Sequence, residues 1–172
     1  MNLVPAFLED FFCFREGNKI PGTVDVTLPK ITPKSVTASG AGIAGDMDMP
    51  TKGQTENMET EITFRTTTEE VVALSQCKST LVEFRGAQFV YNTGTGEYEK
   101  NPCAVVMRIM PKEPDLGKFA SAESTESKIT ANVAYLKVTI DGKKMVEIDK
   151  FNYIHYVYGT DYLADVRSML GL

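Results

Sequence analysis

The segment from Thr125 to Asp149 constrains the fold of this chain more than any other. Two runs of alternating apolar and polar residues, Lys128 to Ile140 and Lys143 to Asp149, are separated by Asp141-Gly142. Because Asp and Gly tolerate positive φ, this pair suits the two-residue turn of a tight β-hairpin. The alternation predicts that the hairpin is antiparallel and that only one of its faces is buried.

Shorter segments with the same alternation predict a mainly β fold around this hairpin. The expected strands are Thr23 to Leu28, Asn57 to Arg65, Ser79 to Tyr91, Cys103 to Met110 and Phe151 to Tyr158, with Ile31 to Val36 resuming a strand around Pro33. The apolar segment Val4 to Phe14 must be covered, but its pattern leaves helix and strand both open. The plan is seven or eight strands, which favours antiparallel β-structure.

Two short helices are predicted beside the strands. The first begins after a Thr N-cap in Thr66 to Thr68, with Glu69 and Glu70 in its first turn, where the helix dipole favours anions. The second spans Tyr162 to Leu170, capped by Thr160 or Asp161 and stopped by Gly171. Its spacing predicts a buried side made of Leu163, Val166 and Leu170.

The stretch Gly40 to Gln54 shows neither helical nor strand periodicity. It holds four glycines, a proline and two methionines, and predicts a long loop at about residues 40–56. Loops longer than about 12–15 residues in compact domains are commonly binding elements. A mobile surface insertion is the alternative.

Composition limits the class of protein. With 172 residues and no linker-like segment, the chain is expected to form a single domain over residues 1–172. A formal charge of -5 argues against an ordinary nucleic-acid binder, which would cluster Lys and Arg. Three cysteines without metal-type spacing are expected to be free thiols, and no apolar run is long enough to span or anchor in a membrane.

No catalytic, cofactor-binding or metal-binding constellation is visible. The single histidine, His155, lies in an alternating aromatic strand, where a packed residue is more common than a general base. Asp46 and Asp48 lack the further oxygen ligands and the closing Glu of a calcium loop. We therefore expect no enzyme, no cofactor and no metal. The apolar N-terminal segment, the methionine-containing loop and the aromatic C-terminal strand instead indicate surface for self-association.

Several ordered motifs resemble the major tail tube protein family of contractile-tailed bacteriophages and R-type bacteriocins. They include Lys112-Glu113, Asp115-x-Gly117, Thr125 to Ile129, Val146 to Asp149 and the C-terminal set Gly159, Asp161, Leu163, Arg167 and Leu170 to Leu172. Thr27 to Lys30 and Gly40 to Ile43 are similar to the family's early strand end and glycine-rich loop. Residues 1–22 and 66–104 match poorly.

The resemblance implies an antiparallel β-sandwich or barrel-like tail tube fold with one or two short flanking helices. It implies that copies close into hexameric rings, stacked into a hollow tube within a contractile sheath. Expected partners are other copies, the sheath protein, and baseplate, initiator and terminator proteins. DNA would pass through the tube without being bound specifically. The protein would not be anchored in a membrane. The protein would lie in the virion tail, or in a bacteriocin particle, after assembly in the host bacterial cytoplasm.

Within this framework we predict two sets of residues. Inter-ring or inter-subunit contacts are assigned to Gly40, Ala41, Gly42, Ile43, Gly45, Met47, Met49, Phe7 and Phe11. A lumen lining that repels DNA phosphates is assigned to Glu59, Glu61 and Glu83, for which plain solvent exposure is the alternative.

Two other functions stay open at this point. One is a tube subunit of a headless contractile injection particle, an R-type bacteriocin, and the sequence cannot separate this from a phage tail. The other is a monomeric β-sandwich whose long loop binds a ligand. Sedimentation or negative-stain microscopy separates the monomer from the two tubes.

Overall fold

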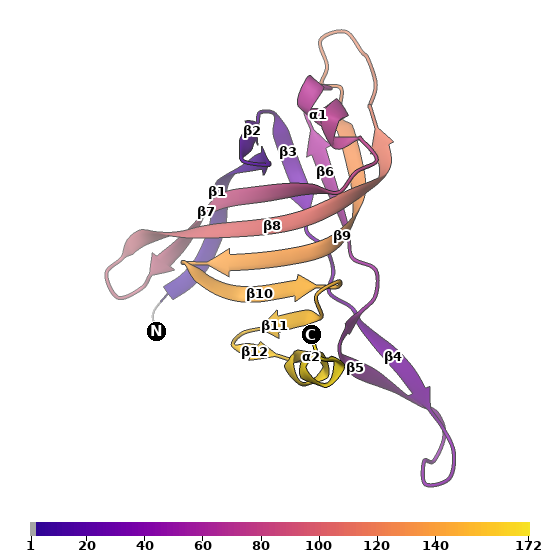
Figure 1. Cartoon of the computed structure of the whole chain (residues 1–172). Helices are drawn as coiled ribbons and strands as arrows, with labels where there is room; N and C mark the ends of the chain where they lie inside the picture. The colour runs from indigo at the N-terminus through magenta and orange to yellow at the C-terminus, as the bar shows by residue number, and fades with distance from the viewer. Residues whose placement is uncertain (1–2) are drawn as a thin grey trace.

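The computed structural model describes residues 3–172, which form mostly antiparallel β-structure with two short helices (Figure 1). The strands are β1 (Leu3–Arg15), β2 (Asn18–Ile20), β3 (Thr23–Thr27), β4 (Pro33–Ala38), β5 (Met47–Thr55), β6 (Glu59–Phe64), β7 (Thr80–Asn92), β8 (Glu97–Asp115), β9 (Ser127–Ile140), β10 (Lys143–Asp149), β11 (Ile154–Val157) and β12 (Thr160–Asp161). The helices are α1 (Glu69–Leu74) and α2 (Ala164–Leu170). No helix in residues 3–172 combines the length and apolarity needed to cross a bilayer.

Ten strands form one sheet in the order β12-β11-β10-β9-β8-β7-β1-β2, with β6 and β3 joined to it through β9. The N-terminal half of β9 pairs with β6, and its C-terminal half pairs with β10. At the junction the β8–β9 register passes from Arg108↔Tyr135 to Ile109↔Val133 and leaves Ala134 as an extra residue. Such a bulge bends a strand, so one sheet can turn around a core instead of staying flat.

The core lies inside this bend. Side chains of Ile62 and Phe64 on β6 are buried together with Met107 on β8 and Ile129 on β9. Val71 and Leu74 of α1 belong to the same cluster, and so α1 closes one end of the bent sheet (Figure 1). The core is thus assembled from residues at alternate positions on several strands.

The predicted hairpin is confirmed. β9 and β10 are joined by Asp141 and Gly142, whose φ angles of 50° and 71° are those expected for a turn of this kind. The inward face predicted for residues 57–65 is also confirmed, since Met58, Ile62 and Phe64 are buried. Thr68 caps α1 as predicted, accepting a hydrogen bond from Val71 N.

The structure settles the N-terminal segment as strand β1. It pairs with β7 over most of its length and with β2 only at Cys13 to Arg15. The strand predicted at Thr23 to Leu28 is present as β3 and pairs with β6. Of its alternating apolar residues, only Val26 packs against the core, and Val24 and Leu28 are exposed. The count of seven or eight strands was too low, because the described residues form twelve.

The expectation of a loop throughout residues 40–54 was wrong. Met47 to Thr55 is strand β5, paired with β4 in a separate two-stranded sheet. Gly53, Pro50 and Asp48 weaken the local β signal, but backbone pairing to β4 supplies the missing stabilisation. Only residues 39–46 connect the two strands.

The connection between the strands predicted at Ser79 to Tyr91 and at Cys103 to Met110 is also shorter than those bounds imply. Residues 93–96 make the turn, and β8 already begins at Glu97. Tyr91 and Tyr98 lie across this hairpin with ring centroids 5.2 Å apart, a cross-strand contact that extends both strands.

The C-terminal helix is shorter and less buried than predicted. Its C-cap is Gly171 at φ 73°, as expected, but Asp161 lies two residues before the N-cap Leu163. Leu163 is buried, whereas Val166 and Leu170 are 39% and 56% exposed in the single chain. The predicted buried side is therefore wrong for Val166 and Leu170, because α2 covers little of the described chain, and Arg167 is its one partly buried residue.

Candidate assembly surfaces

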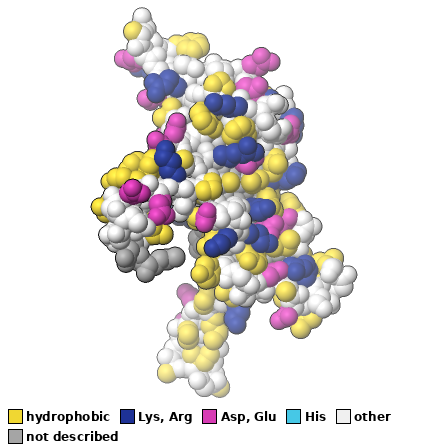
Figure 2. Space-filling model, turned by 90° about the vertical axis from the view of Figure 1, so that its left-hand side faces the viewer, with side chains coloured by type: hydrophobic (Ala, Val, Ile, Leu, Met, Phe, Trp, Pro, Cys, Tyr) yellow, Lys and Arg dark blue, Asp and Glu magenta, His cyan; other side chains and the backbone are white. Residues whose placement is uncertain are grey.

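β4 and β5 form an arm that projects away from the main sheet (Figure 1). The register pairs Val36 with Met49 and Ala38 with Met47, so these four side chains share one face of the arm. We call them the apolar arm face. Val36 is 60% exposed and Met47 is 55% exposed, and Figure 2 shows hydrophobic side chains along the arm at the bottom of the molecule.

The opposite face of the arm is polar. Thr37 and Asp48 form a register pair there, and Thr37 Oγ1 donates a hydrogen bond of 2.7 Å to Asp48 Oδ1. The arm is therefore amphipathic, like a strand pair that covers a core, although in the single chain its apolar face meets no core.

Most of the predicted contact residues lie on this arm. Gly40, Ala41, Gly42, Ile43 and Gly45 belong to the connection at its tip, and Met47 and Met49 belong to the apolar arm face. All seven are exposed. Sequence reasoning missed Val36 as their neighbour, although its place in the alternating run after Pro33 was the available signal.

The two predicted phenylalanines lie on β1, away from the arm (Figure 1). Phe7 is 56% exposed and stacks on Phe89 with ring centroids 5.1 Å apart. Phe11 packs against the core cluster and lies 6.2 Å from the Phe84 ring. The structure therefore brings neither residue to the arm tip, and only Phe7 presents most of its ring to solvent. Their role as contacts stays a prediction.

The three glutamates predicted to line a lumen are all paired with cations. Glu59 Oε1 lies 3.0 Å from Lys112 Nζ, and Glu61 Oε1 lies 3.4 Å from Lys128 Nζ. Glu83 binds Arg85 through two hydrogen bonds of 2.7 and 2.9 Å. These are exposed pairs of small energetic weight, but each one cancels a local charge.

The pairing is visible in the side chains' acid–base properties and on the surface. Hydrogen bonding to Glu59, followed by its charge, raises the pKa of Lys112, and Glu83 raises the pKa of Arg85 in the same way. Figure 2 shows Lys and Arg side chains interspersed with Asp and Glu over the body of the protein. The three glutamates lie on a surface of mixed charge, and their assignment to the lumen stays a prediction.

The strand order from β12 to β2 has an incompletely paired edge at each end, and β3, which pairs only with β6, is a further edge of the branched sheet. On one side, β1 pairs with β2 only at its last three residues, so residues 3–12 have one free backbone edge. On the other side, β12 covers β11 only at Tyr156 and Val157. Free edges present unpaired N–H and C=O groups that can pair with another chain.

The opposite end of the molecule from the arm carries a second exposed apolar group. Residues 116–126 connect β8 and β9 near α1, at the top of Figures 1 and 2. This loop is held at its base, where Lys118 N donates to Thr125 O and Thr125 N donates to Arg65 O. Phe119 is nevertheless 91% exposed, and Leu116 is 54% exposed.

His155 is a packed side chain. It is 9% exposed on β11, and its ring lies 5.9 Å from the ring of Tyr162. Burial lowers the pKa of His155, partly offset by the charge of Asp161. Across residues 3–172, no three His, Cys, Asp or Glu side chains gather closely enough to hold a metal ion.

Comparison with known proteins identifies the family. The family model described as "Phage tail tube protein FII" matches residues 5–171. The tail tube protein of Escherichia phage P2 is 32% identical over 98% of this chain and 99% of its own length. The major tail tube protein of Serratia phage KSP20 is 25% identical over 98% of both chains.

A solved structure shows a related fold. A chain of the sheath/tube terminator structure of an extracellular contractile injection system in its extended state matches with a TM-score of 0.51 and 16% identity. The match covers 78% of this chain and 96% of that chain. Because the family model and both phage proteins match nearly end to end, the chain belongs to the phage tail tube protein FII family.

Proposed function

We propose that this tail tube protein closes into hexameric rings, that the rings stack into a hollow tube inside a contractile sheath, and that DNA passes through the bore into the host cell. The role is structural and not catalytic. The observation that supports this proposal is the arm formed by β4 and β5, whose exposed apolar face has no partner among residues 3–172.

The physical argument for self-association begins with the arm. An isolated two-stranded hairpin is marginally stable in water and needs a third strand or a packing surface. Val36, Met47 and Met49 supply apolar side chains for such packing. Methionine is flexible and fills irregular gaps, which suits a contact formed only on assembly. In a homopolymer the packing surface belongs to another copy.

The direction of stacking follows from the two ends of the subunit. The arm and the loop at residues 116–126 project from opposite ends in both views (Figures 1 and 2). A contact repeated by translation along an axis joins one end of a subunit to the opposite end of the next, and such contacts generate filaments. We assign the arm, including the tip residues 40–45, and the Phe119 loop to contacts between successive rings.

Ring closure is assigned to the open sheet edges. Residues 3–12 of β1 lie at one end of the strand order, and β11 with β12 lies at the other. Closing these edges between neighbouring subunits removes groups that otherwise invite uncontrolled pairing. On this assignment Phe7, on β1, contacts a neighbour within the ring.

The charge of the chain suits passive passage of DNA. Six chains of formal charge -5 bring about thirty negative charges to each ring, a field that repels phosphates. Glu59, Glu61 and Glu83 remain the proposed lining. Because each is ion-paired, the repulsion comes from the net charge of the ring more than from these three groups.

The proposed partners and location of the assembled tube are based on membership of the tail tube family. The proposed partners beyond other copies are the sheath protein and the baseplate, initiator and terminator proteins. The proposed location is the virion tail, after assembly in the host cytoplasm. A single domain over residues 1–172, with the arm as its stacking element, is part of this proposal.

Negative-stain microscopy and sedimentation of the purified chain test the proposal. We expect rings or tubes at high concentration, and a chain that remains monomeric contradicts it. Val36→Ser with Met49→Ser is expected to leave a folded subunit that no longer stacks. The control is Ser35→Asn on the polar face of the arm, which is expected to polymerise normally. Stacking by the double variant would show that the arm assignment is wrong.

A further inference from the structure

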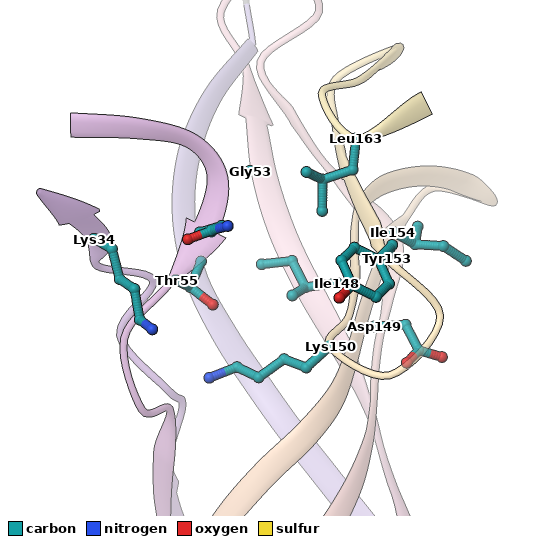
Figure 3. A pocket seen from close by; sticks show the side chains of 10 residues that line it. Lys34, Gly53, Thr55, Ile148, Asp149, Lys150, Tyr153, Ile154 and Leu163 are labelled. Atoms are coloured by element: carbon teal, nitrogen blue, oxygen red, sulfur yellow. The ribbon is translucent and has the colours of Figure 1, made fainter. Parts of the chain in front are cut away.

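A pocket of about 240 Å3 separates the base of the arm from the body of the protein (Figure 3). The arm contributes Lys34, Gly53 and Thr55 to its wall, and the body contributes Ile148, Lys150 and Leu163, among others. Figure 3 shows the side chains of Lys34 and Lys150 reaching into this space from opposite walls, below Thr55. The pocket thus receives one ammonium group from the arm and one from the body.

The charge of Lys34 acts on Lys150 across the pocket. Lys150 is half-buried, and burial together with the charge of Lys34 lowers the pKa of Lys150. Lys150 Nζ donates one hydrogen bond, of 2.5 Å, to the backbone oxygen of Glu56. Within the described part of the chain, neither lysine forms an ion pair, and so both ammonium groups lack a direct carboxylate partner.

The one carboxylate in the pocket wall is engaged elsewhere. Asp149 accepts hydrogen bonds from the backbone N–H groups of Phe151 and Asn152, at 3.0 Å each, and from the Asn152 side chain at 2.6 Å. Figure 3 shows its carboxylate directed away from the two lysines. Asp149 keeps its negative charge, because these donors are neutral, but its carboxylate forms no ion pair with Lys34 or Lys150 among the described residues.

We propose that this pocket is an oxyanion site, in which a carboxylate from a second copy of the chain bridges Lys34 and Lys150. An ammonium group has three N–H donors, and Lys150 uses one of them on Glu56, so both lysines keep donors for an incoming anion. Bonds between ammonium and carboxylate groups are among the stronger hydrogen bonds in proteins. A second copy is the natural source because acidic residues exceed basic ones in this chain, 23 to 18.

The site couples the position of the arm to assembly. Without an anion, the like charges of Lys34 and Lys150 favour separation of the arm from the body. A carboxylate between them reverses the sign of this interaction and draws the arm toward the body. The arm is therefore held in place when a neighbour arrives. This inference rests on the proposed self-assembly for the source of its carboxylate, but not for the existence of the anion site.

Inorganic phosphate, used as a free oxyanion, tests the site in the unassembled chain. Thermal unfolding is followed while phosphate replaces chloride at constant ionic strength. Phosphate is expected to stabilise the wild type and the control Lys52→Gln, a lysine of the same arm outside the pocket. Lys34→Gln and Lys150→Gln are each expected to weaken the apparent phosphate affinity by about tenfold or more, the effect of losing one charged hydrogen bond.

If phosphate stabilises the wild type and the three lysine variants equally, the pocket is not an oxyanion site. Lys34 is exposed, so Lys34→Gln keeps the test valid if Lys150→Gln does not fold. Assembly then identifies the source of the anion. If a second copy supplies the carboxylate, both pocket variants assemble more slowly than Lys52→Gln, and phosphate slows assembly of the wild type.

Normal assembly of both variants, together with their loss of phosphate binding, would reject the second copy and leave a free oxyanion as the ligand. Failure of the wild type to assemble at all would contradict the proposed function. The phosphate titration would still decide the anion site in that case.

Discussion

Gly53, at the base of the arm, lies directly against the side chain of Leu163, the residue before α2. A Cβ atom added at Gly53 would lie 2.5 Å from Leu163 Cγ, and the φ of Gly53 is +86°. Only glycine adopts this backbone conformation without strain and also leaves room for Leu163. The arm and the C-terminal segment, which are distant in sequence, are therefore packed at this point through the absence of a side chain.

Gly53→Ala is expected to destabilise the protein. Positive φ costs an alanine about 1 kcal/mol, and displacing Leu163 adds about 1–3 kcal/mol as for other overpacked sites. Gly42→Ala is the matched control, because Gly42 has a φ of +94° but no atom near its Cβ position. Urea unfolding measures both variants. In a Leu163→Ala background, Gly53→Ala is expected to cost less than in the wild type, because the side chain that it displaces is gone. Equal losses at Gly53 and Gly42 in the wild-type background would exclude a steric contact.

Asp161 is expected to hold the C-terminal segment in place. Its carboxylate accepts hydrogen bonds from Leu163 N at 3.1 Å and from Arg167 Nη1 at 2.8 Å. Asp161→Ala removes both, together with the hydrogen bond that the carboxylate accepts from His155 N at 3.3 Å, and is expected to cost about 1–3 kcal/mol of unfolding free energy. Amide hydrogen exchange is expected to accelerate mainly at Leu163 and in α2. Asp165→Ala, on the exposed side of the same helix, is the control, and a similar acceleration there would argue against a specific role of Asp161.

The three thiols are expected to react with a disulfide reagent in a fixed order. Cys77 is exposed, Cys103 is partly buried, and Cys13 is fully buried. Burial raises the pKa of Cys13 to about 12 and also raises the pKa of Cys103, and the thiolate is the reactive form. We expect one fast phase from Cys77, a slower phase from Cys103, and reaction of Cys13 only on unfolding. Cys77→Ser should remove the fast phase, and rapid reaction of Cys13 in the folded chain would contradict its burial.

Stability is expected to fall in mild acid because of His155. Burial lowers the pKa of His155 below its ordinary 6.5, so the unfolded chain binds this proton more readily than the folded chain does. The stabilisation from the neutral side chain is complete above pH 6.5 and is lost as the pH falls from that value through the folded pKa. His155→Gln is expected to flatten the pH dependence of thermal unfolding in this window. An unchanged slope would assign the effect to other groups.

Local residue preferences were sufficient to predict several elements of the fold. Asp141 and Gly142 predicted their turn because few residue pairs adopt positive φ at low cost. Thr68 predicted the start of α1 because a side-chain oxygen there satisfies a free backbone N–H. Alternation along residues 57–65 identified the buried face of β6, since side chains on a strand point to opposite faces in turn.

The sequence indicated which residues belong to the candidate assembly surface, but it did not predict their secondary structure. The glycines and methionines at residues 40–49 were selected correctly as an unusual segment, but as a loop. The amphipathic arm became visible only when β5 was paired with β4, which placed Val36 beside Met49. The anion pocket was not predictable, because Lys34 and Lys150 are far apart in sequence and meet only through the packing of the arm base.

What the sequence determined by itself was the antiparallel β character, the central hairpin, the start of α1, the end of α2 and the family. These depend on residue preferences and spacings that act over a few neighbouring positions. The tertiary structure alone decided that β3 pairs with β6, that residues 47–55 form a strand, and that Gly53 meets Leu163. Partner choice depends on which distant backbone groups and side chains complete one another in three dimensions, and no local pattern carries that information.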